Sequence, residues 1–60
     1  MSIKHIRKKN GITQLELSKK INVDQTTVSK WESGEAKPRV DTLIKLAKLF
    51  DCSIDELLEE

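Results

Sequence analysis

Four side chains in the segment 24–33 carry hydrogen-bonding groups at a spacing that places them on one face of a helix. Val28 and Trp31 are apolar and three residues apart, so in such a helix they would face the core. The opposite face then holds an amide, two hydroxyls and an ammonium group, on Gln25, Thr26, Ser29 and Lys30. Groups of this kind can bind the base edges of duplex DNA. An ordinary helical hairpin with a solvated polar face has the same pattern.

Histidine and cysteine, which form nucleophile–base pairs and zinc sites, are scarce in this sequence. His5 and Cys52 are the single histidine and the single cysteine, and they stand near opposite ends of the chain outside any nucleophile–base motif. One cysteine cannot form an internal disulfide, and neither residue has the partners of a zinc site. The two glycines, Gly11 and Gly34, do not form a phosphate-binding loop. We therefore expect no enzyme activity, no metal site, no cofactor and no small-molecule ligand.

Length and charge distribution favour one small domain with a polyanionic partner. The chain has 60 residues and a net charge of +1, and we expect a single domain over residues 1–60. Residues 1–30 carry a net charge of +5 and residues 31–60 a net charge of −4, which suits one face turned toward a polyanion. Chance clustering on a solvated surface would produce the same asymmetry. Without an apolar membrane span or a secretory signal, the sequence predicts a cytoplasmic protein with no membrane partner.

Apolar spacing and capping residues predict five short helices and no sheet. The expected helices cover about residues 2–9, 13–21, 24–33, 39–50 and a last segment that starts at residue 53. Capping boxes are expected where Thr13 precedes Glu16 and where Ser53 precedes Glu56. Asp24 is expected to cap the third helix. The predicted fold class is therefore all-α.

Asn22 is the central residue of the turn between the second and third helices. A turn this tight needs a residue that tolerates left-handed backbone geometry, and Asn does so more readily than most residues. Val23 would anchor the turn to the core, so that residues 13–33 form a candidate helix-turn-helix. The other helices are expected to end at Asn10-Gly11, at Ser33-Gly34 and at Asp51.

Residues 13–34 resemble the helix-turn-helix of the phage-repressor/Cro-like family. The matching stretches read TQLELS from residue 13 and INVDQTTVSKWESG from residue 21. Further matches are Ile6-Arg7 before this segment and Pro38, LIKLA at 43–47 and SIDEL at 53–57 after it, so the similarity covers nearly the whole chain. The resemblance implies a five-helix, lambda-repressor-like domain that binds double-stranded DNA with its third helix in the major groove. It also implies a transcription regulator, most often a repressor, that acts at a near-palindromic operator.

The resemblance implies roles for individual residues. Bases would be read by Gln25, Thr26, Ser29 and Lys30. Phosphates would be contacted by Gln14, Thr27, Lys37 and Arg39. Gln14 would also brace Gln25, whose amide can bond adenine N6 and N7 at once. Arg7 and Glu32 would form a structural ion pair between the first helix and the end of the third.

The family pattern further implies a homodimer. Its contacts are expected from Leu49, Ile54, Leu57 and Leu58. Because no oligomerisation domain follows within the 60 residues, we expect a weak dimer that DNA strengthens. An antitoxin, a restriction-system controller, or a protein-interaction module that no longer binds DNA remain alternative functions of such a fold. A steep salt dependence of binding would distinguish DNA from a protein partner.

Several positions depart from the residues usual in this family. Asn22 and Asp51 replace helix-ending glycines, and Ser18 replaces an alanine at a close helix contact. Arg39 stands where a serine or threonine cap is common, which weakens the start of the fourth helix but adds a cation. Cys52 stands where valine is usual, and we expect it to act as a small buried hydrophobic residue.

Overall fold

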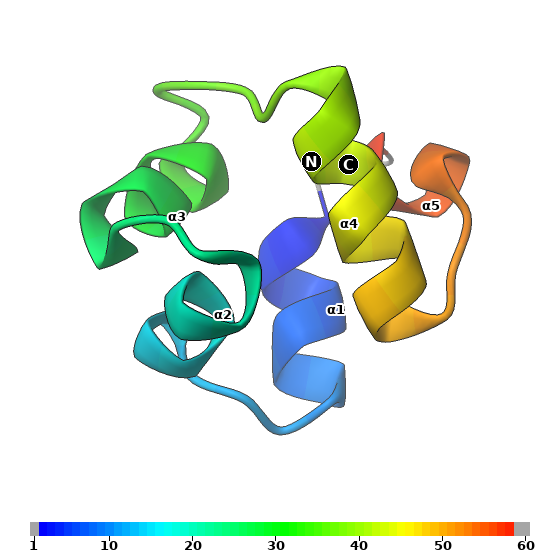
Figure 1. Cartoon of the computed structure of the whole chain (residues 1–60), viewed down its shortest axis with the longest axis horizontal. Helices are drawn as coiled ribbons and strands as arrows, with labels where there is room; N and C mark the ends of the chain where they lie inside the picture. Colours follow the sequence, from blue (N-terminus) through cyan, green and yellow to red (C-terminus); the bar gives the residue numbers. More distant parts are fainter. Residues whose placement is uncertain (1, 59–60) are drawn as a thin grey trace.

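The computed structural model describes residues 2–58, which form five helices (Figure 1). Their bounds are α1 Ile3–Lys9, α2 Gln14–Ile21, α3 Gln25–Ser33, α4 Val40–Phe50 and α5 Ile54–Leu58. The described part of the chain contains no strand, so the all-α prediction is confirmed. Each helix begins one residue after its expected start, because the first four predictions counted the N-cap residue as helical. Residues 1, 59 and 60 of the predicted domain lie outside the described range.

The helices place α3 and α5 on opposite sides of the molecule. Figure 1 shows α1 and α4 between them, with α2 beside α3. Helices α2 and α3 share the most extensive contact, while α1 contacts both α3 and α5. The orientation of α3 therefore depends on its contacts with α2 and α1.

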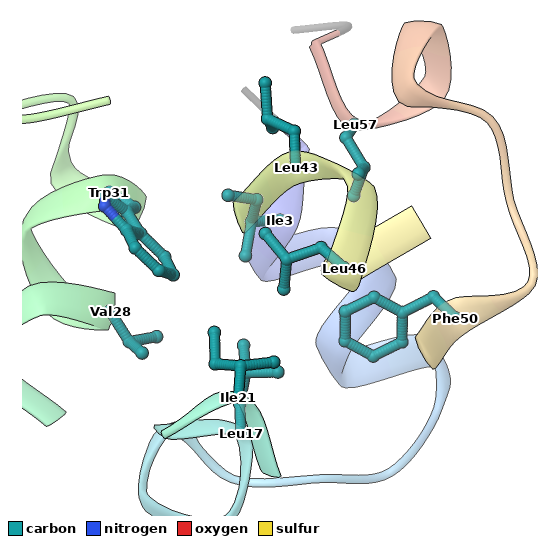
Figure 2. Packing of buried hydrophobic residues seen from close by; sticks show 9 residues of the cluster. All are labelled: Ile3, Leu17, Ile21, Val28, Trp31, Leu43, Leu46, Phe50 and Leu57. Atoms are coloured by element: carbon teal, nitrogen blue, oxygen red, sulfur yellow. The ribbon is translucent and has the colours of Figure 1, made fainter. Parts of the chain in front are cut away.

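One hydrophobic cluster joins all five helices. Figure 2 shows its members, which are Ile3, Leu17, Ile21, Val28, Trp31, Leu43, Leu46, Phe50 and Leu57. Val28 and Trp31 point from α3 into this cluster, and Trp31 is only 5% exposed. The prediction that these two residues form the core face of the third helix is confirmed. The polar face of α3 consequently points out of the molecule.

Hydrogen bonds at the helix starts match the predictions in part. Thr13 and Glu16 form the full capping box, with Glu16 N–H donating to Thr13 Oγ1 at 3.1 Å and Thr13 N–H donating to Glu16 Oε1 at 3.0 Å. Hydrogen bonding to the Thr13 backbone, and next to the Thr13 side chain, holds the pKa of Glu16 below its ordinary value. At the start of α5, Ser53 Oγ accepts from Glu56 N–H at 3.1 Å, which is one of the two bonds expected there.

The expected side-chain cap at Asp24 is wrong. Asp24 occupies the N-cap position with extended backbone geometry, but its side chain makes no capping hydrogen bond. Its carbonyl group starts the helix instead, by accepting from Thr27 N–H at 3.0 Å. Arg39 also lacks a capping bond at α4, because a guanidinium has donors only and cannot accept a backbone N–H.

Left-handed residues end the helices where the sequence predicted breaks. Asn22 has φ 60°, Gly34 has φ 83° and Asp51 has φ 52°. After α1, Gly11 takes the left-handed geometry with φ 70°, while Asn10 stays at φ −90° and donates from Nδ2 to Ile6 O at 2.8 Å. Asn22 and Asp51 thus adopt the left-handed geometry that glycine most often supplies at helix ends.

The structure corrects one of the four expected dimer residues. Leu57 is fully buried, because α5 packs back onto the start of α1 and directs this side chain into the core (Figure 2). Ser2 strengthens that contact, since its N–H donates to Leu57 O at 3.0 Å and its hydroxyl donates to Glu56 O. Ile54 is half-buried and also packs on the core. Leu49 and Leu58 remain exposed.

Cys52 was expected to be a small buried hydrophobic residue. Cys52 is half-buried and packs against the core cluster, where burial raises the pKa of its thiol. Cys52 thus contacts the core, as expected, but it is not fully buried.

Within residues 2–58, no helix combines the length and the apolar character that crossing a bilayer requires.

The left-handed geometry at Asp51 leads to a stability prediction. We expect Asp51→Gly to raise the free energy of unfolding by about 0.5–1 kcal/mol, because glycine adopts positive φ without a Cβ penalty and the change removes a negative charge beside the C-terminus of α4. Urea denaturation measures the effect. Asp51→Asn removes the charge but keeps a side chain, and should stabilise less. A Gly variant no more stable than the parent would contradict the prediction.

Candidate nucleic-acid interface

The turn between α2 and α3 determines how the polar face is presented. Val23 N–H donates to Ser18 O at 2.9 Å, which closes the chain around the left-handed Asn22. Ser18 is 3% exposed, and its hydroxyl donates to Leu15 O at 2.7 Å. A small side chain at this position lets α2 and α3 approach closely, and the hydrogen bond satisfies its buried hydroxyl. The serine in place of alanine is therefore compatible with the close helix contact.

The face of α3 that points outward carries the residues predicted to read bases. Gln25, Thr26, Ser29 and Lys30 are all exposed. Three of them, together with Gln14 from α2, line a shallow hollow of about 260 Å³. Lys30 does not line this hollow. The lining therefore consists of amide and hydroxyl groups without a formal charge, which can donate to or accept from base edges.

A buried ion pair lies next to this hollow. Arg7 Nε donates to Glu32 Oε2 at 2.7 Å and Arg7 Nη2 donates to Glu32 Oε1 at 3.0 Å. The side chains of Arg7 and Glu32 are 9% and 4% exposed. A third bond runs from Arg7 Nη1 to Ile12 O at 2.8 Å. The structure thus contains the predicted pair between α1 and the end of α3, in the bidentate geometry that gives Arg–carboxylate pairs their directionality.

Gln14 takes a different partner from the one expected. Its amide nitrogen Nε2 donates to Glu32 Oε1 at 3.0 Å, and the described residues show no hydrogen bond from Gln14 to Gln25. The prediction that Gln14 braces Gln25 is therefore wrong for the unbound protein. The carboxylate of Glu32 attracts the amide because Gln14 starts α2 next to the end of α3. Both glutamines still line the same hollow.

The loop after α3 carries the two predicted phosphate-binding cations. Lys37 and Arg39 are exposed, while Pro38 between them is buried and anchors the loop. Thr27, the remaining predicted phosphate contact, is half-buried. The loop begins close to α3, since Glu35 N–H and Ala36 N–H both donate to Lys30 O, at 3.0 and 3.2 Å.

Two contacts near the site were not predicted from the sequence. One is the bond from Gln14 to Glu32. The other is an exposed ion pair in which Lys30 Nζ lies 4.0 Å from Glu35 Oε2. No periodic pattern indicates either contact, because the residues lie on different elements. Residues 2–58 contain no cluster of three or more side chains suited to a metal ion.

Comparison with known proteins identifies the class to which this chain belongs. The profile of the helix-turn-helix family matches residues 3–57. The chain therefore belongs to the helix-turn-helix family, and the resemblance to phage repressors is confirmed.

Three relatives illustrate the range of this class. The chain is 38% identical to the HTH-type transcriptional activator BcrR of Enterococcus faecalis, over 93% of this chain and 28% of the relative. It is 39% identical to the HTH-type transcriptional regulator ImmR of Bacillus subtilis, over 93% of this chain and 44% of the relative. It is 40% identical to Repressor protein C2 of Salmonella phage P22, over 88% of this chain and 24% of the relative. The chain thus spans less than half the length of these relatives, and no solved structure matches it.

Removing one partner of the buried ion pair should destabilise the domain strongly. We expect Arg7→Met to lower the free energy of unfolding by about 3 kcal/mol or more, because it leaves the Glu32 carboxylate buried without its cation. The double variant Arg7→Met/Glu32→Leu buries no charge and should recover most of the loss. Urea denaturation of the three proteins tests this. A double variant as unstable as the single one would contradict the explanation.

The same pair produces a pH dependence of stability. Burial raises the pKa of Glu32, but hydrogen bonds from Arg7 and Gln14 and the nearby cations outweigh it and hold the pKa below its ordinary value of 4.5. Because the pKa of Glu32 is lower in the folded state than in the unfolded state, its ionised carboxylate stabilises the fold at any pH above the unfolded-state pKa. This stabilisation is lost as the pH falls through the folded-state pKa. Between about pH 5 and pH 3, Glu32→Gln should therefore lose stability less steeply than the parent. Melting temperatures across this range measure the difference, and parallel curves would contradict it.

Proposed function

We propose that this chain regulates transcription by binding a specific site in double-stranded DNA, with α3 in the major groove. The hollow lined by Gln14, Gln25, Thr26 and Ser29 carries the proposal, because its uncharged donors and acceptors match the hydrogen-bonding edges of bases. The hollow also lies on the face of α3 opposite the core, where a groove of DNA can reach it.

Each polar residue of α3 has a proposed role in reading bases. The amide of Gln25 bonds adenine N6 and N7 together. Thr26 offers a hydroxyl to a base edge or a methyl group to thymine. Ser29 and Lys30 lie one turn further along α3, and Lys30 donates to guanine O6 and N7.

Phosphate contacts are proposed on both sides of this face. Gln14 lies beside α3 at the start of α2, Thr27 lies in the first turn of α3, and Lys37 and Arg39 extend from the loop after it. Because Asp24 does not cap α3, the first N–H groups of that helix have no side-chain acceptor from this residue and can face a phosphate. Such contacts hold the protein in register without reading sequence.

A second copy of the chain is the proposed partner on DNA. Of the expected dimer contacts, Leu49 and Leu58 are exposed and Ile54 is half-buried, and Val40 and Ile44 of α4 are exposed as well, at 70% and 42%. These four exposed side chains are far fewer than the roughly 20–30 residues that each partner contributes to a stable interface. The dimer therefore forms mainly on DNA.

Repression is the regulatory outcome that we propose. A dimer on a near-palindromic operator covers two half-sites about 10–10.5 base pairs apart, and occupation of such a site blocks polymerase. One similar protein is a named repressor and another is a named activator. The polar face of α3 supports DNA binding whether the outcome is repression or activation. The first experiment therefore measures DNA binding.

Selection of duplexes from a random DNA pool at physiological salt tests the proposed function. We expect a near-palindrome with half-sites about one helical turn apart. A single enriched half-site would contradict the dimer but not the reading role of α3. No enrichment by a folded, helical protein would contradict specific DNA binding and favour a protein-interaction module.

Substitutions at Gln25 and Lys37 should separate base reading from phosphate binding. Gln25→Ala should cost about 1–3 kcal/mol on the selected site and relax the preference at one base pair. Lys37→Ala should weaken binding to all sequences alike and flatten the slope of log affinity against log salt. Fluorescence anisotropy with the selected and scrambled duplexes measures both effects. An equal loss on all sequences for Gln25→Ala would contradict its reading role.

A further inference from the structure

The acidic side chain of Glu35 lies beside a residue that the proposed function assigns to base reading. Its Oε2 is 4.0 Å from Lys30 Nζ, and the two side chains are 67% and 51% exposed. A separation of 4.0 Å holds the ammonium group by charge and is too long for a hydrogen bond. The three N–H donors of Lys30 therefore remain free for an acceptor on DNA.

The backbone holds Glu35 in this place. Its N–H donates to Lys30 O at 3.0 Å and to Ser33 Oγ at 3.4 Å, and the Ser33 hydroxyl donates to the same Lys30 carbonyl at 3.1 Å. Gly34, with φ 83°, turns the chain so that these bonds can form. The main chain of Glu35 is thus bonded to the last turn of α3, which places its side chain within reach of Lys30.

A carboxylate at this position opposes phosphate binding. It lies beside Lys30 and two positions before Lys37 in the chain, and the proposed function directs both of these cations toward DNA. A negative charge there repels the backbone of any DNA sequence. A free lysine, by contrast, binds phosphates of every sequence as a point charge. The presence of Glu35 at this position therefore needs an explanation other than a gain in affinity for DNA.

We propose that Glu35 is a positioning residue that makes Lys30 selective, an inference that rests on the proposed function. Its carboxylate keeps the ammonium group of Lys30 close to the end of α3, where it meets a base acceptor in the major groove. On a specific site, Lys30 binds the base while it stays beside Glu35. On other DNA, Lys30 must leave Glu35 to reach a phosphate, and it loses the ion pair.

The specificity ratio, which is the affinity for the selected duplex divided by that for a scrambled duplex, tests this proposal. We expect Glu35→Gln to raise the affinity for the scrambled duplex more than that for the selected duplex. The ratio should fall by up to about fivefold at low salt, the upper limit expected from an exposed ion pair, and by less at high salt because the charges are screened.

A double-mutant cycle shows whether the effect acts through Lys30. In a Lys30→Gln background, Glu35→Gln should change the affinity for both duplexes equally and leave the ratio unchanged. Glu56→Gln on α5 is the matched control, because it makes the same substitution and charge change at another exposed residue. It should leave the ratio unchanged. Melting temperatures verify that all the variants are folded.

Three outcomes would overturn the inference. A specificity ratio that Glu35→Gln does not lower, with DNA binding intact, overturns the inference alone. The inference is also overturned if Glu35→Gln lowers the specificity ratio equally in the parent and in the Lys30→Gln variant, because Glu35 would then act without Lys30. If the parent protein binds neither duplex in a salt-dependent manner, the proposed function fails and the inference fails with it.

Discussion

The buried carboxylate of Glu32 is the group on which the orientation of α3 depends. It accepts two hydrogen bonds from Arg7 of α1 and one from Gln14 of α2. A buried charge is tolerated only where opposite charge and hydrogen bonds offset the loss of hydration, so a shift of any of the three helices would cost free energy. The polar face of α3 is thus oriented by a network that lies behind it.

This network is necessary because the hydrophobic core is small. A chain of about 60 residues buries only about 60% of its unfolded surface, and α3, with 9 residues, is too short to be stable by itself. Val28 and Trp31 attach one side of α3 to the core. Apolar packing is weakly directional, whereas the bidentate bonds between Arg7 and Glu32 require one geometry. The two together determine both the depth and the rotation of α3.

Charge is arranged differently at the centre and at the edge of the proposed interface. The hollow contains amides and hydroxyls, while Lys37 and Arg39 lie on the loop beyond α3. Base edges are distinguished by the direction of hydrogen bonds, and phosphates attract any cation. Uncharged groups at the centre therefore favour selectivity, and cations at the edge favour affinity. Glu35 fits this arrangement if it restrains the one cation that lies on α3 itself.

Much of the fold was predictable because its signals are local. Helix periodicity, the Thr13–Glu16 capping box and the left-handed Asn22 each depend on residues within four or five positions of one another, and the structure contains all three. The predictions for Asp24 and Leu57 failed for a different reason. A residue type permits a cap or an exposed apolar contact, but the side-chain rotamer and the packing of neighbouring helices decide whether it forms.

The sequence by itself thus determined the helices, their ends and the set of polar side chains that face outward on α3. The resemblance to a known family supplied the pairing of Arg7 with Glu32, which periodicity alone does not indicate. Only the tertiary structure showed that Gln14 binds Glu32, 18 residues away, and that the loop holds Glu35 beside Lys30. Such contacts join separate elements, and their geometry exists only after the core has brought those elements together.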